Sequence, residues 1–263
     1  MVDLESFLDA TRTDLGRDLS RNPEQYDIVS APIDQSMKVV AGPGSGKTTV
    51  LVLRILKAIY VDGVEPSEIM ATTFTRRAAS EMRSRILSWG EKLRHTLLEN
   101  ADDADRERLL RVNFGAVVMG TIDSLSQSVM TEYRLPSDRP PAIIEPYVQR
   151  MFMSSAGYSV VGFDDEGVVS AELNQLFNTK AYARTKNCTS TLFNLRNRMK
   201  ENMIPLDVLE DKFPKIHKIL DRYESKLEER CIVDYLTMEE NFLRFIRSEK
   251  SEDFTKGIKL LMV

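Results

Sequence analysis

The stretch AGPGSGKT, from Ala41 to Thr48, decides the fold of this chain of 263 residues. A short apolar run, residues 37–41, leads into it, and residues 48–61 follow with apolar side chains at helical spacing. A strand, a glycine-rich loop and a helix in this order are typical of a P-loop, whose glycines let successive backbone N–H groups turn towards phosphate oxygens. We therefore predict a strand over 37–41 and a helix over 48–61, with a phosphate-binding loop between them.

The polar residues at the end of this loop carry the expected chemistry. Lys47 is expected to reach the β- and γ-phosphates, and the Thr48 hydroxyl is expected to ligate Mg²⁺. A P-loop by itself indicates only that a nucleoside triphosphate binds, because hydrolysis also needs a carboxylate on a neighbouring strand. Asp123 and the pair Asp164-Asp165 each follow a short apolar run, so both are weak candidates for that carboxylate.

Outward from the loop, the pattern predicts strands over 69–73 and 116–119, separated by a long helix over 78–97. Strands that alternate with helices favour an α/β fold with a parallel sheet. The polar stretch 99–107 reads as a surface turn with a short helix after it. Further helices are expected before the loop, up to about residue 20 and over 24–29. Beyond Leu125, prolines punctuate the chain, and we expect helices over 148–153, 170–177, 192–199, 216–229 and 236–248, then a buried strand over 258–263.

The composition excludes several classes of protein. Hydrophobic residues make up 42% and charged residues 29% of the chain, as in a globular protein, and no apolar run approaches the length of about 18 residues that a membrane span needs. The acidic amino-terminal segment is no signal peptide, and two distant cysteines make no disulfide scaffold or zinc site. We expect a cytoplasmic protein without a membrane partner. Because the net charge is -4, any contact with nucleic acid must come from a local groove.

Residues 71–86, ATTFTRRAASEMRSRI, resemble motif Ia of UvrD/Rep-type superfamily 1 DNA helicases, whose pattern is close to TFTNKAAxEMxxRI. Other segments follow in the order of that family. Residues 22–25 resemble its Q motif, the P-loop its GAGSGKT, residues 120–125 its GTFHSL and residues 232–236 its LVDFxxLL. The resemblance covers nearly the whole chain. It implies a RecA-like P-loop NTPase domain with a parallel sheet and a mainly helical insertion subdomain.

The resemblance also implies the domain organisation. Residues 1–135 and 231–263 would form the RecA-like ATP-binding domain, 1A, and residues 136–230 the insertion, 1B. In the family, a strand like 259–263 runs directly into Asp-Glu-x-x-Asp, and this chain stops one residue short of that motif. We therefore expect an amino-terminal fragment without the Mg²⁺ carboxylate, the catalytic glutamate and the second RecA-like domain, which would act in cis or in trans.

Residue roles carry over where the motifs match. The resemblance implies ATP and Mg²⁺ as cofactors, with Gln25 at the adenine edge, although Gln25 taken alone is more often a surface residue. Thr49 stands where the family often has arginine, so one adenine-side contact does not carry over. Catalytic roles fall to Lys47 and Thr48, and Thr48 also ligates the metal. The implied cofactor-binding set is Gln25, Ala41, Gly42, Pro43, Gly44, Ser45, Gly46, Lys47, Thr48 and Thr49.

For DNA, the resemblance implies a single-strand path along Phe74, Thr75 and Arg76, with Thr121 beside them. Phe74 offers a stacking surface, and Thr75 and Arg76 offer phosphate contacts. The competing interpretation is a plain turn from strand to helix. Ile122 and Asp123 replace the Phe-His of the family, which weakens a contact there and makes Asp123 a poorer metal ligand.

A local basic stretch is a separate candidate for DNA contact. Between residues 180 and 200 there is no acidic side chain, and the basic ones are Lys180, Arg184, Lys186, Arg196, Arg198 and Lys200. A stretch of this kind can bind phosphates, but it is also typical of a solvated helix face.

Three hypotheses for function follow. The first is an ATP-dependent DNA helicase of the repair and replication class, moving 3′ to 5′ on single-stranded or partly duplex DNA, of which this chain is an inactive ATP-binding part. The alternative is a non-enzymatic module that binds nucleotide and DNA and needs a separate partner half. The third, an unrelated P-loop enzyme such as a small-molecule kinase, is disfavoured by the motif Ia-like block.

Overall fold

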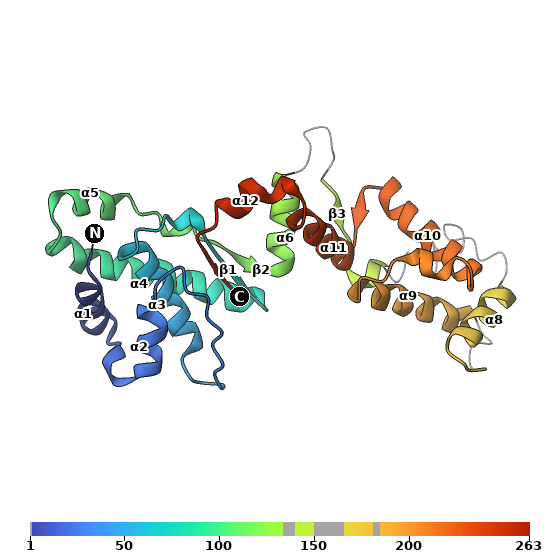
Figure 1. Cartoon of the computed structure of the whole chain (residues 1–263), viewed down its shortest axis with the longest axis horizontal. Helices are drawn as coiled ribbons and strands as arrows, with labels where there is room; N and C mark the ends of the chain where they lie inside the picture. The colour runs from blue at the N-terminus through green and yellow to red at the C-terminus, as the bar shows by residue number, and fades with distance from the viewer. Residues whose placement is uncertain (1, 134–139, 150–165, 181–184) are drawn as a thin grey trace. The chain divides into compact units, whose positions relative to one another are not determined.

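The computed structural model describes residues 2–133, 140–149, 166–180 and 185–263. The chain divides into two compact units (Figure 1). The first, which we call the sheet unit, comprises residues 1–125 and 249–263, and the second, which we call the helical unit, comprises residues 126–248. Among the helices in the described ranges, none has both the length and the apolar character to cross a membrane.

A parallel sheet of three strands organises the sheet unit. Its strands are β1 (Ile69–Thr73), β2 (Val118–Thr121) and β5 (Leu260–Met262), in the order β2-β1-β5. Thr73 pairs with Thr121, and Ala71 pairs with Met262, so the carboxyl ends of the strands share one edge. The predicted parallel sheet and α/β fold are confirmed. The second strand lies two residues later than predicted, because a 3₁₀ turn occupies Phe114–Ala116.

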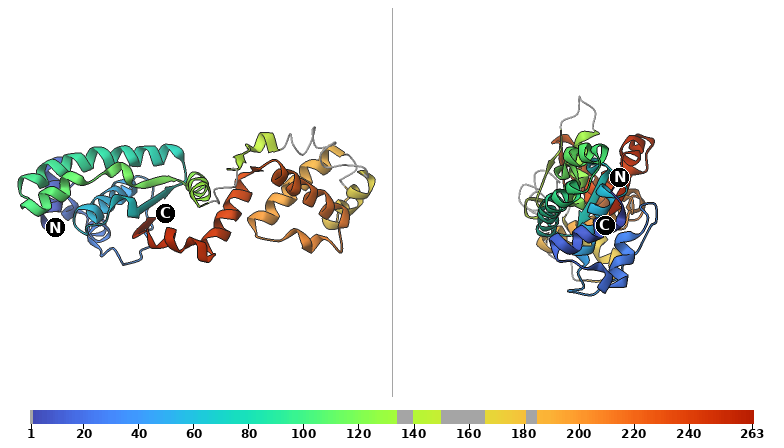
Figure 2. Two further views of the ribbon diagram at one scale, coloured as in Figure 1. Left: turned by 90° about the horizontal axis from the view of Figure 1, so that it is seen from above. Right: turned by 90° about the vertical axis from the view of Figure 1, so that its left-hand side faces the viewer.

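Helices pack around this sheet, and the longest of them is α4. The helices are α1 (Leu4–Leu15), α2 (Pro23–Ser30), α3 (Lys47–Tyr60), α4 (Arg76–Glu99), α5 (Asp103–Arg111) and α12 (Glu252–Lys256). Short 3₁₀ turns occur at Leu19–Arg21, Pro66–Glu68 and Glu249–Ser251. Figure 2 shows α1 and α5 beside the end of α4 that points away from the sheet. The predicted helices over 24–29, 48–61 and 78–97 are confirmed.

The core of the sheet unit forms around α3. Val52, Leu53, Ile55 and Leu56 are fully buried, and so are Ile69 and Ala71 of β1. Each buried branched side chain contributes about 1.5–3 kcal/mol relative to an exposed one. Helical spacing alone gives a helix one apolar stripe, but α3 is buried on nearly every side, which explains why its sequence is apolar almost throughout.

Two predicted elements of the sheet unit are wrong. Residues 37–41 form no strand, and Val40 is 87% exposed. An apolar run becomes a strand only where it pairs with a neighbour, and this run pairs with none of the described strands. The polar stretch 99–107 is not simply a turn, because α5 begins inside it at Asp103. The Asp102 carboxylate caps that helix by accepting from the Asp105 N–H at 2.8 Å.

Most of the helical unit is made up of helices α8 (Glu166–Leu176), α9 (Thr185–Glu201), α10 (Pro214–Glu229) and α11 (Tyr235–Ile246). This unit also contains the two-residue strands β3 (Ala142–Ile143) and β4 (Ile232–Val233), which pair in parallel. A 3₁₀ turn spans Leu206–Leu209. These four helices match the predicted ones. Helix α6 (Ile122–Glu132) leads into this unit and was not predicted. Most of the helix expected over 148–153 lies outside the described residues.

The boundaries of the units differ from the domain limits expected from the sequence. The division falls at 125/126 and 248/249, whereas the sequence suggested 135/136 and 230/231. Strand β4 and α11 group with the helical unit because β4 pairs with β3 and α11 bonds to α9. The assignment of domains 1A and 1B to these residues stays a prediction.

Candidate functional site

The glycine-rich loop adopts a backbone that requires glycine. Gly44 and Gly46 have φ angles of 76° and 83°, in the left-handed region that other residues rarely adopt. The Ser45 hydroxyl donates to the Gly42 carbonyl at 2.9 Å and closes the turn. Gly46 is the N-cap of α3 and provides no side-chain partner for its first turn. The first N–H groups of α3 therefore point into the loop, where an anion can accept from them.

Lys47 bends back over this loop. Its ammonium donates to the carbonyl oxygens of Ala41, at 3.0 Å, and of Gly42, at 2.5 Å. A bound phosphate would have to take over these contacts. Thr48 and Thr49 are partly exposed in the first turn of α3. An ammonium, a hydroxyl and a helix terminus within four residues are the donor set that suits a triphosphate with Mg²⁺, so the residues fit the expected cofactors.

Gln25 lies directly against the loop. Its side-chain Nε2 donates to the Ser45 carbonyl at 3.1 Å, and a methyl group added at Gly46 would lie 3.2 Å from the same nitrogen. The local sequence explains the placement. Asn22 caps α2 by accepting from the Gln25 N–H at 3.2 Å, and Pro23 starts the helix, so Gln25 falls in its first turn. Residues 22–25 and the P-loop, which the sequence related only by their order along the chain, are thus in contact.

A second group of predicted residues lies where β1 and β2 end. Phe74 follows β1 and is 100% exposed. Thr75 caps α4 by accepting from the Ala78 N–H at 3.1 Å, and Arg76 is the exposed first residue of that helix. Thr121 ends β2, directly opposite Thr73. The register therefore places Thr121 beside the turn that carries Phe74, as the predicted DNA path requires.

Some predicted residues are already engaged in the turns around them. The Thr121 hydroxyl accepts from the Ser124 N–H at 3.3 Å, which ties it to the start of α6. Asp123 is half-buried in the first turn of α6. Within the described residues, no cluster of three or more His, Cys, Asp or Glu side chains could hold a metal ion. The candidates Asp164 and Asp165 lie outside the described residues.

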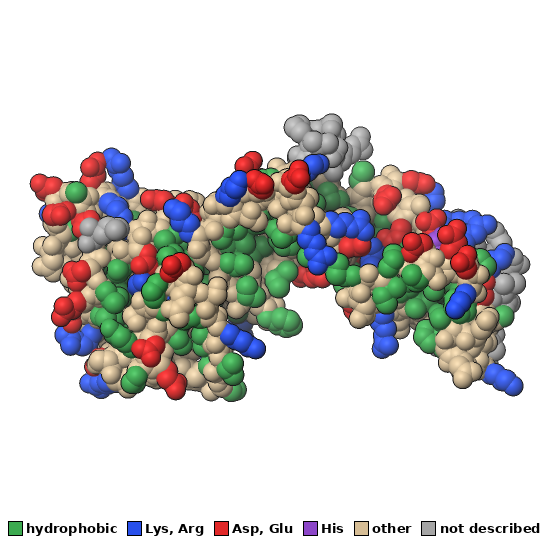
Figure 3. Space-filling model, in the orientation of Figure 1, with side chains coloured by type: hydrophobic (Ala, Val, Ile, Leu, Met, Phe, Trp, Pro, Cys, Tyr) green, Lys and Arg blue, Asp and Glu red, His purple; other side chains and the backbone are tan. Residues whose placement is uncertain are grey.

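Among the described residues of the basic stretch 180–200, the basic side chains do not share one exposed face. Lys180 and Arg198 are exposed, whereas the Arg196 side chain is fully buried and that of Lys200 is 15% exposed. Arg184 and the side chain of Lys186 are not among the parts that the structure describes. On the face shown in Figure 3, acidic and basic side chains are interspersed.

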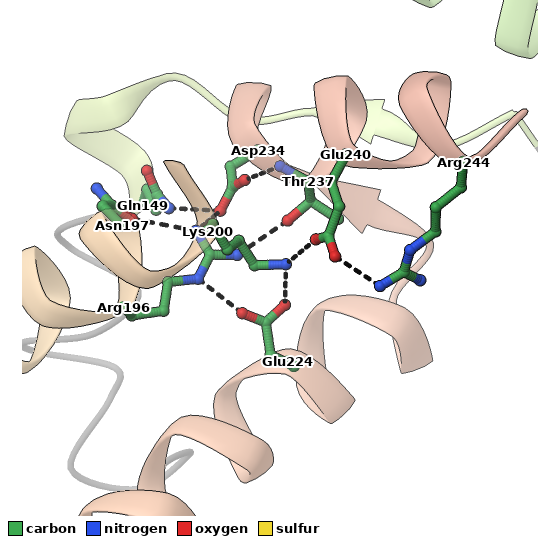
Figure 4. A network of polar contacts seen from close by, with 9 residues as sticks. All are labelled: Gln149, Arg196, Asn197, Lys200, Glu224, Asp234, Thr237, Glu240 and Arg244. Atoms are coloured by element: carbon green, nitrogen blue, oxygen red, sulfur yellow. Dashed lines mark hydrogen bonds and ion pairs between the residues drawn. The ribbon is translucent and has the colours of Figure 1, made fainter. Parts of the chain in front are cut away.

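Arg196 and Lys200 belong instead to an internal network of ion pairs (Figure 4). Arg196 Nε donates to Glu224 at 2.6 Å, and its other nitrogens bond to Asp234 and Thr237. Lys200 lies 3.4 Å from Glu224 and 2.9 Å from Glu240. Burial acts to lower the pKa of Arg196, but the bonds and charges of the two carboxylates raise it overall. These cations therefore hold α9, α10 and α11 together.

The sequence interpretation missed two buried cations in the sheet unit. Arg54 and Lys57 of α3 are 5% and 4% exposed, and both bond to backbone carbonyls that follow or end α2. The signal was present in the sequence. Both residues interrupt the otherwise apolar run of α3, and a charge within such a run needs a specific partner.

Comparison with known proteins agrees with these motifs. Residues 21–263 match the family model described as UvrD/REP helicase N-terminal domain. The DNA helicase II of Salmonella typhimurium is 52% identical over 67 residues, which are 26% of this chain and 9% of that protein. The Haemophilus influenzae DNA helicase II is 42% identical over 88 residues, or 34% of this chain and 11% of that protein.

A third relative carries a different name. One of the subunits of an ATP-dependent helicase/nuclease from Lactobacillus delbrueckii is 36% identical over 107 residues, which are 41% of this chain and 9% of that protein. The matched part of the chain thus spans about a tenth of the length of these relatives. The family match extends over far more of the chain than any of these pairwise matches. The chain belongs to the UvrD/REP helicase family and matches its N-terminal domain.

Proposed function

We propose that this chain is the ATP-binding part of an ATP-dependent DNA helicase that moves 3′ to 5′ on single-stranded DNA in repair or replication. The contact between Gln25 and the Ser45 carbonyl carries the proposal, because it joins a base-recognising amide to a phosphate-binding loop. ATP bound here would place its phosphates at the start of α3. Gln25 retains a free N–H and a carbonyl oxygen, which match the N7 acceptor and the N6 amino donor of adenine.

The chain's own residues suggest a division of labour. Lys47 would exchange its two carbonyl contacts for phosphate oxygens, and the Thr48 hydroxyl would hold Mg²⁺. Mg²⁺ would neutralise charge between the phosphates. Phe74 and Arg76 would grip single-stranded DNA at the carboxyl edge of the sheet, by stacking and by phosphate contact. A second RecA-like domain, in cis or in trans, would complete the site.

Binding of a fluorescent ATP analogue with Mg²⁺ tests the nucleotide site. Lys47→Ala should weaken binding at least about tenfold, because a charge-assisted contact contributes about 1.5–3 kcal/mol. Lys92→Ala is the matched control, since Lys92 is an exposed lysine on α4 and should leave the affinity unchanged. Equal affinity for the two variants would contradict the assignment of the P-loop.

The alternative proposal is a non-enzymatic module that binds nucleotide and DNA and needs a partner half. Hydrolysis also needs a carboxylate that holds Mg²⁺ and arginines from a second RecA-like domain, so both proposals expect little hydrolysis by the P-loop half of the site alone. A DNA-stimulated turnover above about 1 s⁻¹, within the usual range for enzymes, would contradict both. Hydrolysis that appears only when a second RecA-like domain of the family is added would favour the helicase.

A further inference from the structure

Arg54 lies on α3, seven positions after Lys47, and its guanidinium reaches across to the chain at the end of α2. Nη1 donates to the carbonyl oxygens of Ile28, at 2.7 Å, and Ala31, at 3.0 Å. Nη2 donates to the carbonyl oxygen of Pro32 at 3.0 Å. These three carbonyls lie at and just beyond the carboxyl-terminal turn of α2, where a helix leaves backbone acceptors without partners. Arg54 therefore caps α2 from a neighbouring helix.

Lys57, one turn further along α3, supports the same end of α2. Its ammonium donates to the Ala31 carbonyl at 3.3 Å and lies 2.8 and 2.9 Å from the two carboxylate oxygens of Asp62. Burial lowers the pKa of Arg54, and the charge of Asp62 acts in the opposite direction. A buried cation is costly unless its hydrogen bonds are satisfied, so both side chains depend on these partners.

The shape of the guanidinium is essential to this arrangement. Arginine presents several N–H groups in a fixed planar fork, whereas lysine carries a compact charge on a flexible stem. The two terminal nitrogens of the fork reach the carbonyls of three residues at once, whereas lysine offers a single nitrogen for all of its contacts. Replacement of Arg54 by lysine would keep the charge and lose this geometry.

Helix α2 is therefore attached to the P-loop segment at both of its ends. At the amino-terminal end, Gln25 bonds to the Ser45 carbonyl, and at the carboxyl-terminal end Arg54 holds the backbone. The helix has eight residues, and a helix of that length is unstable in isolation. Its position depends on these attachments and on the packing of Val29, which is fully buried.

We propose that Arg54 is a positioning residue for base recognition, which holds α2 on α3 and thereby keeps the Gln25 amide beside the P-loop to select adenine. The proposal rests on the proposed function, because it assumes that ATP binds there. Adenine offers a donor and an acceptor to the amide, whereas guanine offers two acceptors on the same edge. Displacement of α2 should therefore reduce the preference for ATP over GTP and leave phosphate binding intact.

The test measures binding of fluorescent ATP and GTP analogues with Mg²⁺ to the full chain, with inorganic tripolyphosphate as a competitor that reports the P-loop alone. We expect the native chain to prefer ATP and Gln25→Ala to abolish that preference. Arg54→Lys should reduce the ratio of ATP to GTP affinity about fivefold, the effect of one net hydrogen bond, with tripolyphosphate affinity unchanged. In the double variant, Arg54→Lys should change the ratio of ATP to GTP affinity little beyond the effect of Gln25→Ala, because Arg54 acts through Gln25.

Arg108→Lys is the matched control. Arg108 of α5 also donates to helix-terminal carbonyls, those of Ile59 and Tyr60, but at the other end of α3. It should leave the ATP to GTP ratio unchanged. If circular dichroism shows that Arg54→Lys does not fold, Lys57→Met tests the same attachment and should lower the ratio in the same direction.

The outcomes separate the two proposals. A native chain without preference for ATP would overturn the proposed function together with this inference. A native preference that Gln25→Ala abolishes but the folded Arg54 variant retains would overturn only the inference. An Arg54 variant that circular dichroism shows to be folded could lose affinity for tripolyphosphate in step with affinity for ATP. That result would assign Arg54 to the P-loop and would also overturn the inference.

Discussion

Arg196 of α9 and Asp234, the N-cap of α11, form an ion pair whose side chains are 0% and 3% exposed. The Asp234 carboxylate also accepts from Gln149 Nε2 at 2.5 Å and from the Thr237 N–H at 2.8 Å. The ring of Tyr223 lies 5.4 Å from the Arg196 guanidinium. Asp234 belongs to the segment that resembles LVDFxxLL, so the structure gives that segment a role in joining the helices of the helical unit.

Arg196→Met should destabilise the helical unit by about 3–5 kcal/mol, because it leaves the buried carboxylate of Asp234 without its cation and Glu224 with Lys200 alone. Arg198→Met on the same helix should change stability by less than about 0.5 kcal/mol, since Arg198 is exposed. Hydrogen exchange of the amides in α9, α10 and α11 measures the change in stability for both variants. Equal protection in the two variants would contradict a structural role for the network.

The stability of the helical unit should also depend on the charge of Glu240. Burial acts to raise the pKa of Glu240, but hydrogen bonds and charges from Lys200 and Arg244 lower it overall. A carboxyl whose pKa is lower in the folded state stabilises above its unfolded pKa of about 4.3 and loses that effect as pH falls through the folded pKa. Glu240→Gln should thus be less stable than the native chain at pH 7, with the difference shrinking below about pH 4.

Urea unfolding at several pH values measures this difference. Glu210→Gln is the control, because Glu210 is exposed in the same unit. It should show no comparable pH-dependent difference. A Glu240 effect that stays constant down to about pH 3, below the usual pKa of a glutamate, would exclude this ion pair as its source.

Phe74→Ala should weaken binding of a labelled single-stranded oligothymidine at least about fivefold, because stacking contributes about 1–3 kcal/mol for each base. The side chain is fully exposed, so its removal should not change stability. Leu110→Ala removes another exposed apolar side chain, 61% exposed on α5, and should not change DNA affinity. Fluorescence anisotropy gives both affinities, and an unaltered value for Phe74→Ala would refute the proposed DNA path.

Gly90→Ala should destabilise the sheet unit by about 1–2 kcal/mol, the cost of overpacking less the gain in helix propensity. A methyl group there would lie 2.8 Å from carbons of the buried Phe114 ring, closer than carbon atoms can approach. Fluorescence of Trp89, the only tryptophan, follows unfolding next to this position. Phe114→Leu should offset part of the effect in the double variant, and purely additive losses would contradict steric conflict as the cause.

Much of the fold could be predicted because its signals are local. The P-loop glycines, the apolar spacing of α3 and the caps of α2 and α4 each depend on a few neighbouring residues. Residues 37–41 show where this reasoning fails. Their apolar character suits a strand, yet strand formation depends on a partner that local sequence does not specify. The acidic residues around Asp102 suggested a turn, yet they cap and start α5 through a hydrogen bond between residues three positions apart, which is a local signal.

The sequence by itself determined which residues can hold phosphates and which face of each helix is apolar, because glycine conformation and helical periodicity are properties of short segments. Only the tertiary structure decided which charges are available for binding. Arg196 lies in a stretch that reads as a basic face in the sequence, yet it is buried against Glu224, 28 positions away. Arg54 interrupts an apolar run, but the sequence does not show that Pro32, 22 positions away, is among its partners. Burial and pairing of such charges depend on packing between helices, which no local pattern encodes.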